Sequence, residues 1–199
     1  SVNEEVDITI AGPDFDATIR FDSDVGSNEM EAQITASPQT NTGYPSCGCR
    51  HRPGANTFYF GEIETIGTGT FYWSKRVAGV YTNFASAALA FTDGVWITLR
   101  LAAETVGAQV NLSAWRTNHT STKPADPGWI GVDGSPDLTT SDTAANRIVD
   151  ADAQRMGFNS GGTTNWSADH AKERAISDRA AAAGGVVTPR SFALLGVGS

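Results

Sequence analysis

The sequence predicts an all-β fold, an antiparallel β-sandwich of the jelly-roll type. In residues 94–115, apolar residues alternate with polar or aromatic ones, and this period of two is typical of strands that bury one face. Turn-rich links separate several such short segments, as they do in sandwiches and jelly rolls. The chain has 199 residues, of which 40% are hydrophobic and 18% charged. This composition fits one domain over residues 1–199.

The individual strands follow in chain order from the same alternation. They are expected in residues 14–22, 29–37, 56–65, 69–81, the two halves of 94–115, 153–160 and 190–198. Residues 66–69 ("IGTG") and 104–107 ("ETVG") are the predicted hairpin turns, and Gly107 is free to adopt a positive φ. A turn at 104–107 places Trp96 opposite Trp115, on the face away from the apolar row.

Two segments interrupt the alternation. Residues 116–150 are rich in Pro, Gly, Asp and Thr, and we expect a loop-rich excursion with one strand near 129–132. Residues 167–183 predict the one helix of the chain, with Ser167 as its N-cap and Gly184 after its end. Because the apolar face of this helical insert is mostly alanine, we expect it to lie outside the core as a lid or partner-contact element. The sandwich should then fold without it.

Composition excludes some classes of function. The net charge is −8 and the isoelectric point is near 4.7. With no cluster of Lys and Arg, the chain lacks the basic surface that nucleic-acid binding requires. No apolar run reaches the roughly 18 residues needed to cross a bilayer, so we expect no membrane insertion. The first ten residues also lack the basic and hydrophobic regions of a signal peptide.

Cys47, Cys49 and His51 occupy alternate positions of one expected strand. Alternate positions share a face about 6–7 Å apart, which disfavours a disulfide between the two cysteines. The three side chains are a candidate metal site, although a structural zinc site needs a fourth ligand that the sequence does not indicate. The alternative is a half-buried strand of small residues.

The order of segments resembles laminin-G-like, concanavalin-like jelly-roll domains. The segments that carry this resemblance are residues 15–37, 46–65, 73–90 and 93–116, with the strands "FYFGEI", "GVWITLRL" and "VNLSAW" inside them. Further parallels are Pro124, Ala125 and Trp129, and the last strand, "RSFALLGVGS". The resemblance covers most of residues 6–115 and 151–199. Such domains are found in bacterial secreted proteins and in minor tail proteins of phages that infect actinobacteria.

The resemblance implies a non-catalytic protein on the virion surface, in the phage tail and therefore extracellular. Its expected partners are host-surface glycan or other virion proteins, and we expect a homo-oligomer. Exposed aromatic rings on a sheet can stack on sugar rings, so the candidate ligand-binding residues are Trp96, Trp115, Trp129 and Trp166. Alternatively, residues 116–150 or a neighbouring subunit cover the tryptophans as a satellite core. The chain would then be a capsid decoration protein or a structural oligomer without a ligand.

A second alternative is a jelly-roll polysaccharide hydrolase or lyase. Glu62 and Glu64 share one strand face, and jelly-roll glycosidases of the laminarinase type carry carboxylates at alternating strand positions. One of these carboxylates acts as nucleophile and another as general acid. Here the next residue on that face is Ile66, so a third carboxylate is missing. We therefore do not expect an enzyme, and the two glutamates would belong to an ordinary solvated face.

No cofactor is expected to be required, but a structural calcium ion is possible for a domain of this resemblance. Residues 22–29 ("DSDVGSNE") supply hard oxygen donors of the kind that calcium prefers. The candidate ligands are Asp22, Asp24, Asn28 and Glu29. The segment lacks the full EF-hand spacing, and an ordinary polar hairpin loop is the alternative.

Overall fold

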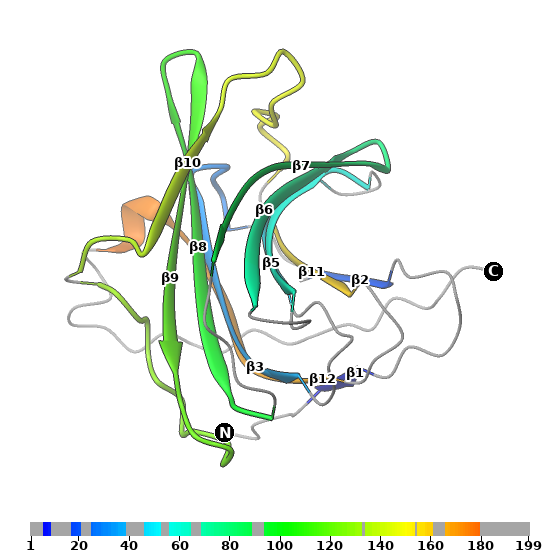
Figure 1. The fold of residues 1–199 in the computed structure, drawn as a ribbon. Helices are drawn as coiled ribbons and strands as arrows, with labels where there is room; N and C mark the ends of the chain where they lie inside the picture. The colour runs from blue at the N-terminus through cyan, green and yellow to red at the C-terminus, as the bar shows by residue number, and fades with distance from the viewer. Residues whose placement is uncertain are drawn as a thin grey trace.

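The computed structural model contains two six-stranded antiparallel sheets that pack face to face (Figure 1). It describes residues 6–8, 17–20, 25–38, 46–52, 56–64, 69–88, 94–132, 134–153, 155–160 and 166–179. The first sheet consists, in spatial order, of β1 (Val6–Ile8), β12 (Trp166–Ala175), β3 (Met30–Pro38), β8 (Ile97–Val106), β9 (Gln109–Asn118) and β10 (Leu138–Asp142). The second consists of β2 (Ala17–Arg20), β11 (Arg155–Ser160), β4 (Ser46–His51), β5 (Phe58–Glu64), β6 (Thr70–Val77) and β7 (Val80–Ala88). A short 3-10 helix, η1 (Ile176–Arg179), follows β12.

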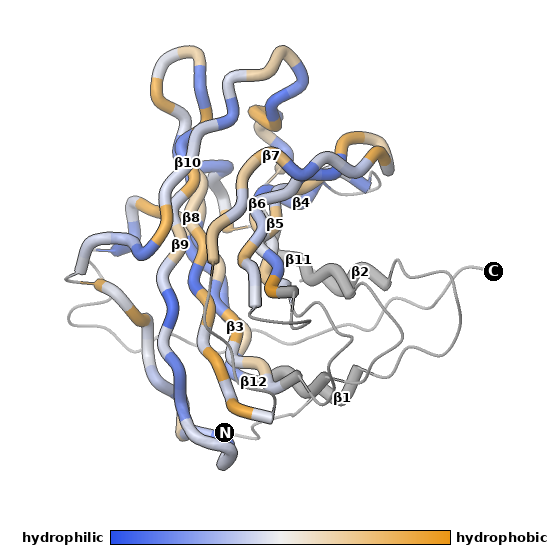
Figure 2. Tube along the Cα trace, viewed as in Figure 1, coloured by the Kyte–Doolittle hydropathy of each residue, from blue (hydrophilic) through white to orange (hydrophobic). Residues whose placement is uncertain are grey.

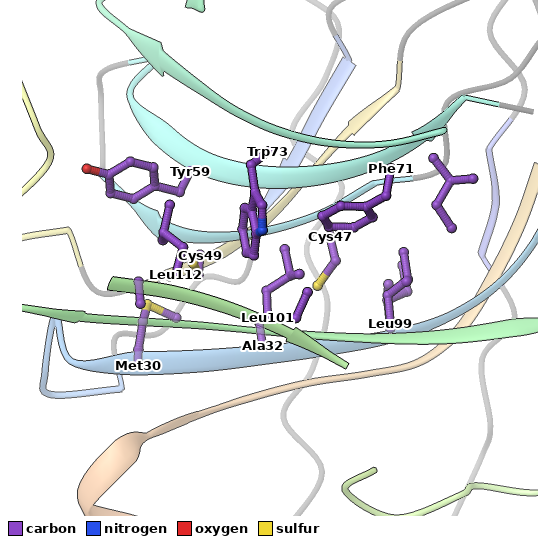
Figure 3. Packing of buried hydrophobic residues seen from close by; sticks show 14 of the residues in the cluster. Met30, Ala32, Cys47, Cys49, Tyr59, Phe71, Trp73, Leu99, Leu101 and Leu112 are labelled. Atoms are coloured by element: carbon purple, nitrogen blue, oxygen red, sulfur yellow. The ribbon is translucent and has the colours of Figure 1, made fainter. Parts of the chain in front are cut away.

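The hydrophobic core lies between the two sheets and explains the alternation in the sequence. Hydrophobic and hydrophilic residues alternate along β8 and β9 (Figure 2). Large side chains of the second sheet meet aliphatic side chains of the first (Figure 3). The main contributors are Tyr59, Phe71 and Trp73 from one side and Ile34, Leu99, Leu101 and Leu112 from the other. The all-β sandwich predicted from sequence is confirmed.

The curvature of the second sheet gives it a concave face, turned away from the first sheet (Figures 1 and 3). Because Tyr59 points into the core, its neighbours Phe58 and Phe60 belong to the concave face. The β6–β7 hairpin turns at Ala78 and Gly79, both with positive φ, as a two-residue hairpin loop requires. The alternation in residues 69–81 predicts a single strand, and the structure divides it at this turn.

The β8–β9 hairpin has a different register from the predicted one. Val106 pairs with Gln109, so the turn consists of two residues, of which Gly107 has a φ of 61°. Two-residue turns match the twist of paired strands, and this favours the glycine within the loop rather than at its end. As a result, Trp115 lies opposite Arg100 and not opposite Trp96.

The predicted helix at 167–183 is wrong. Residues 166–175 form β12, which pairs with β1 on one side and β3 on the other. A bulge with His170 at a φ of 50° shifts the register by one residue between Asp169 and Lys172. The shift changes the parity of the alternation within one strand, which hides the period of two and leaves an apparently helical spacing. Since β12 lies between two strands, it cannot be a removable lid.

The excursion after β9 behaves partly as predicted. Residues 119–132 and Gly134 cross the outer face of the first sheet, and Ile130 is buried there. The expected strand near 129–132 is absent from this described loop, and the strand of the excursion is β10 instead. The expected last strand at 190–198 lies outside the described residues, and the division into one domain stays a prediction. The described part of the chain has no helix with the length and apolarity that crossing a membrane requires.

Candidate functional site

The outer face of the first sheet is polar and, along β3, closed to solvent. Every second residue of β3 points to this face, and these residues are at most 2% exposed. They are Glu31, Gln33, Thr35 and Ser37. The side-chain amide of Gln33 donates to the Gly128 carbonyl at 2.5 Å and accepts from the Ile130 N–H at 2.9 Å. Residues 119–132 and Gly134, the covering loop, are therefore held by polar contacts with the strand beneath them.

Two tryptophans on this otherwise polar face are buried. Trp96 and Trp115 are only 6% and 8% exposed. The Trp115 indole donates to the Gly134 carbonyl at 3.1 Å, and a Cβ at Gly131 would lie 2.2 Å from Trp115 Cδ1. Neither ring offers an open face to a sugar, and for Trp115 the covering residues belong to the segment 116–150. Trp129 in the loop is half-buried, and the side chain of Trp166 lies outside the description.

An ion cluster lies under the covering loop. Glu31 accepts hydrogen bonds from Arg100 Nε at 3.0 Å and Nη2 at 2.5 Å, and from Arg179 Nε at 2.9 Å. Arg174 Nε also donates to it. The Arg100 guanidinium carbon lies 4.2 Å from the Trp115 ring centre, in cation–π contact. Burial lowers the pKa of Arg100, and Arg179 and Arg174 lower it further, against the opposing effect of Glu31.

A second cluster lies on the concave face of the other sheet. Tyr81 is 45% exposed, and its hydroxyl donates to Glu62 Oε1 at 2.6 Å. The Ser74 hydroxyl donates to the same oxygen at 3.2 Å. Phe60 lies beside the Tyr81 ring with 5.8 Å between ring centres. Burial raises the pKa of Tyr81 to about 12, and the hydrogen bond to Glu62 adds to this shift. The hydrogen bond to Glu62 and the contact with Phe60 therefore hold the partly exposed Tyr81 ring in one orientation.

The glutamate pair considered for catalysis is only partly described. Glu62 is 6% exposed and accepts hydrogen bonds from two hydroxyl groups, unlike the solvated glutamate of the alternative explanation. Glu64 closes β5, but its side chain lies outside the description. The separation that would distinguish a retaining from an inverting pair of carboxylates is thus not defined.

The candidate cation sites have mixed outcomes. Asp22 and Asp24 lie outside the described residues, so the calcium site stays a prediction. Asn28 donates to the carbonyl of Val149, and Glu29 accepts from Arg50 at 3.1 Å. These internal contacts would compete with a cation.

The cysteine cluster has no metal-site geometry. Cys47 and Cys49 are unpaired thiols with no exposed surface, in the core between the sheets. The buried Arg50, between Cys49 and His51, has a φ of 55°, which interrupts the strand alternation. His51 therefore does not share the face of the cysteines and stacks on Phe58, with 5.1 Å between ring centres. Within the described residues, no group of three His, Cys, Asp or Glu side chains could hold a metal ion. The strand of small buried residues is the explanation that the structure supports.

Sequence reasoning missed Tyr81, Arg100 and Arg174 as members of a site. Arg100 stands on the outer face of a strand, where an arginine is ordinarily solvated. Tyr81 was assigned to the end of a single strand, because the Ala78–Gly79 turn was not recognised. The only usable signal for that turn was a glycine within an otherwise alternating segment.

Comparisons with known proteins support the fold. No protein-family model matches the chain, and a search of curated proteins also finds no match. CBM66, a carbohydrate-binding module from Bacillus subtilis, matches with a TM-score of 0.54 at 11% identity, over 82% of this chain and 84% of the module. The heptameric SAP-like pentraxin from Limulus polyphemus matches with a TM-score of 0.51 at 11% identity, over 92% of this chain and 82% of the pentraxin. The chain therefore has a concanavalin-like jelly-roll fold.

Proposed function

We propose that this chain is a non-catalytic glycan-binding protein on the surface of a phage particle, in its tail, where it contacts glycan on the host cell. The observation that supports glycan binding is the partly exposed ring of Tyr81 on the concave face, held by its hydrogen bond to Glu62. The fold is shared with a carbohydrate-binding module, which agrees with this use of the face. The virion and extracellular location rests on the sequence resemblance.

Tyr81 has the properties of a sugar-stacking residue. Nearly half of the residue is exposed, while Glu62 and Phe60 restrict its rotation. A ring that is already ordered loses little conformational entropy when a ligand binds. Exposed Asn83 and Ser86 follow on β7, and they pair with Ser74 and Tyr72 across the sheet. They supply hydrogen-bonding groups beside the aromatic surface.

The test is a glycan array followed by titration of the best ligand. Replacing Tyr81 by Ala should weaken binding by about tenfold or more, the scale of one good aromatic contact. Tyr81→Phe keeps the ring and should retain most of the affinity. The matched control is Val80→Ala, which changes a neighbouring side chain that is 68% exposed. An array without any bound glycan, or equal affinity of the Tyr81→Ala and Val80→Ala variants, would refute the proposed site.

A structural, oligomer-forming role is the second candidate, favoured by the edge strand β7. This strand lies at the end of the second sheet, and its nine residues include no charged residue and no proline. Natural edge strands usually carry such residues to prevent pairing with another chain. The β6–β7 turn is also hydrophobic at its tip (Figure 2). Light scattering should then show a multimer that Thr82→Lys dissociates, whereas a monomer at high concentration would count against this role.

A further inference from the structure

Arg174 is a buried cation whose hydrogen-bonding capacity is largely unused. The residue is 7% exposed, and its Nε donates to Glu31. In the part of the chain that the structure describes, its Nη1 and Nη2 are buried and have no hydrogen-bond partner. Leaving such a donor unpaired in the interior is unfavourable, and more so when the donor is charged. Native proteins tolerate few groups of this kind, so this one calls for a ligand.

The surrounding charge has the sign that attracts an anion. Among the described residues of the cluster, Arg100, Arg174 and Arg179 share the single carboxylate of Glu31. This leaves an excess of two positive charges in a site where Arg100 is 2% exposed. Nearby Lys172 does not reduce or add to the excess, because it pairs with Asp126 at 2.6 Å. A guanidinium group binds carboxylate and phosphate through two parallel hydrogen bonds.

Two side chains form the side of the site that faces solvent. The Arg179 side chain is 38% exposed, and only its Nε is bonded within the described residues. The Trp129 ring lies over Arg174, with 4.2 Å from the guanidinium carbon to the ring centre. Its indole N–H is buried without a hydrogen-bond partner in the described part of the molecule. Rotation of this ring breaks no hydrogen bond of its own, while the contacts of Gln33 keep the loop backbone in place.

We propose that Arg174 and Arg179 bind an oxyanion, of the carboxylate or phosphate type, between them when the Trp129 ring rotates aside. The anion completes the hydrogen bonding of Arg174 and offsets the charge that Glu31 leaves unbalanced. This goes beyond the proposed function, because the anion site lies on the outer face of the first sheet and Tyr81 lies on the concave face of the second. Binding of the small anion itself does not depend on the site at Tyr81.

The experiment is a titration of the whole chain with glucuronate, with inorganic phosphate and with neutral methyl glucoside, at constant ionic strength maintained with chloride. Tryptophan fluorescence and calorimetry report binding. We expect saturable binding of at least one oxyanion and none of methyl glucoside. The glucuronate and phosphate arms distinguish a carboxylate-bearing from a phosphate-bearing ligand.

Variants assign the binding to the site. Arg174→Met should weaken the anion by about tenfold or more, because it removes the paired donors but keeps the volume. Arg174→Lys keeps the positive charge but not the two parallel donors, so its anion affinity should lie between those of the wild-type chain and Arg174→Met. The control is Arg52→Met, since Arg52 is an arginine with a 44% exposed side chain and ion pairs to Asp150 and Asp152. Circular dichroism confirms that each variant folds, and loss of folding in Arg174→Met leaves Arg174→Lys as the deciding variant.

Two results would overturn the inference. One is the absence of saturable binding of both oxyanions to the wild-type chain. The other is equal affinity in the Arg174 and Arg52 variants, which would indicate a general anion effect. Either failure is separable from failure of the proposed function, because Tyr81→Ala should leave the anion affinity unchanged. An empty glycan array with intact anion binding would refute the Tyr81 site alone.

Discussion

Replacing Glu31 by Gln should destabilise the protein strongly, because this side chain neutralises part of a buried cluster. Glu31 has no exposed surface and accepts hydrogen bonds from three arginines. Removing one partner of a buried ion pair costs about 3–5 kcal/mol, since the opposite charge stays buried. At a urea dependence of about 2 kcal/mol per molar, the unfolding midpoint falls by about 2 M.

The matched control is Glu29→Gln, two residues earlier in the chain and directly before β3. Glu29 pairs with buried Arg50 but is 35% exposed on its side chain. Arg50 keeps other acceptors, including the Asn28 and Ile148 carbonyls at 2.7 Å each. We expect a loss of about 1 kcal/mol after allowance for solvent screening. Equal urea midpoints for the two variants would refute the account of a charge cluster stabilised by Glu31.

Three further outcomes are expected. Gly131→Ala should destabilise the protein by more than about 1 kcal/mol in thermal melting, because φ is +63° and the new Cβ would lie 2.2 Å from Trp115. The control Gly134→Ala, with no neighbour within 4 Å among the described atoms, should change little. Burial raises the pKa of Cys49 to about 12, so a thiol reagent at pH 8 should react with Cys49 only after unfolding, and rapid reaction of the folded protein would contradict this. Because the pKa of Tyr81 is raised to about 12 in the folded state, the unfolded chain loses that proton first, near pH 10. Stability should therefore fall between pH 10 and 12, and Tyr81→Phe should reduce this fall; an unchanged pH profile would contradict the assignment.

The fold class was predictable because burial of one strand face leaves a period of two in the sequence. Leu99 and Leu101 point into the core as expected. The signal failed at β12, where one extra residue at His170 reverses the parity. It also failed in the β8–β9 turn, because alternation fixes faces but does not fix register.

The candidate sites were harder to predict, because they depend on contacts between distant segments. A polar row such as Glu31, Gln33 and Thr35 normally indicates a solvated face, and only the covering loop makes it a buried one. Trp115 was a candidate residue of that face, and its burial under Gly131 depends on the path of the covering loop, which no local pattern contains. Arg174 lies in the segment that the sequence predicts as a helical insert outside the core, so its burial is not expected from the local pattern either.

The covering loop gives the molecule a third layer that is attached differently from the other two. The sheets adhere through a large apolar core, whereas the buried apolar contacts of the loop are confined to Ala102, Trp115, Ile130 and partly buried Ile176, within the described residues. Its remaining attachments are hydrogen bonds, ion pairs and the contact of the Trp129 ring with Arg174. Regions with little apolar burial open at lower free energy than the core that supports them. We therefore expect the loop to open at a lower free energy than the sandwich, and amide hydrogens such as that of Ile130 should exchange well before those of the central strands.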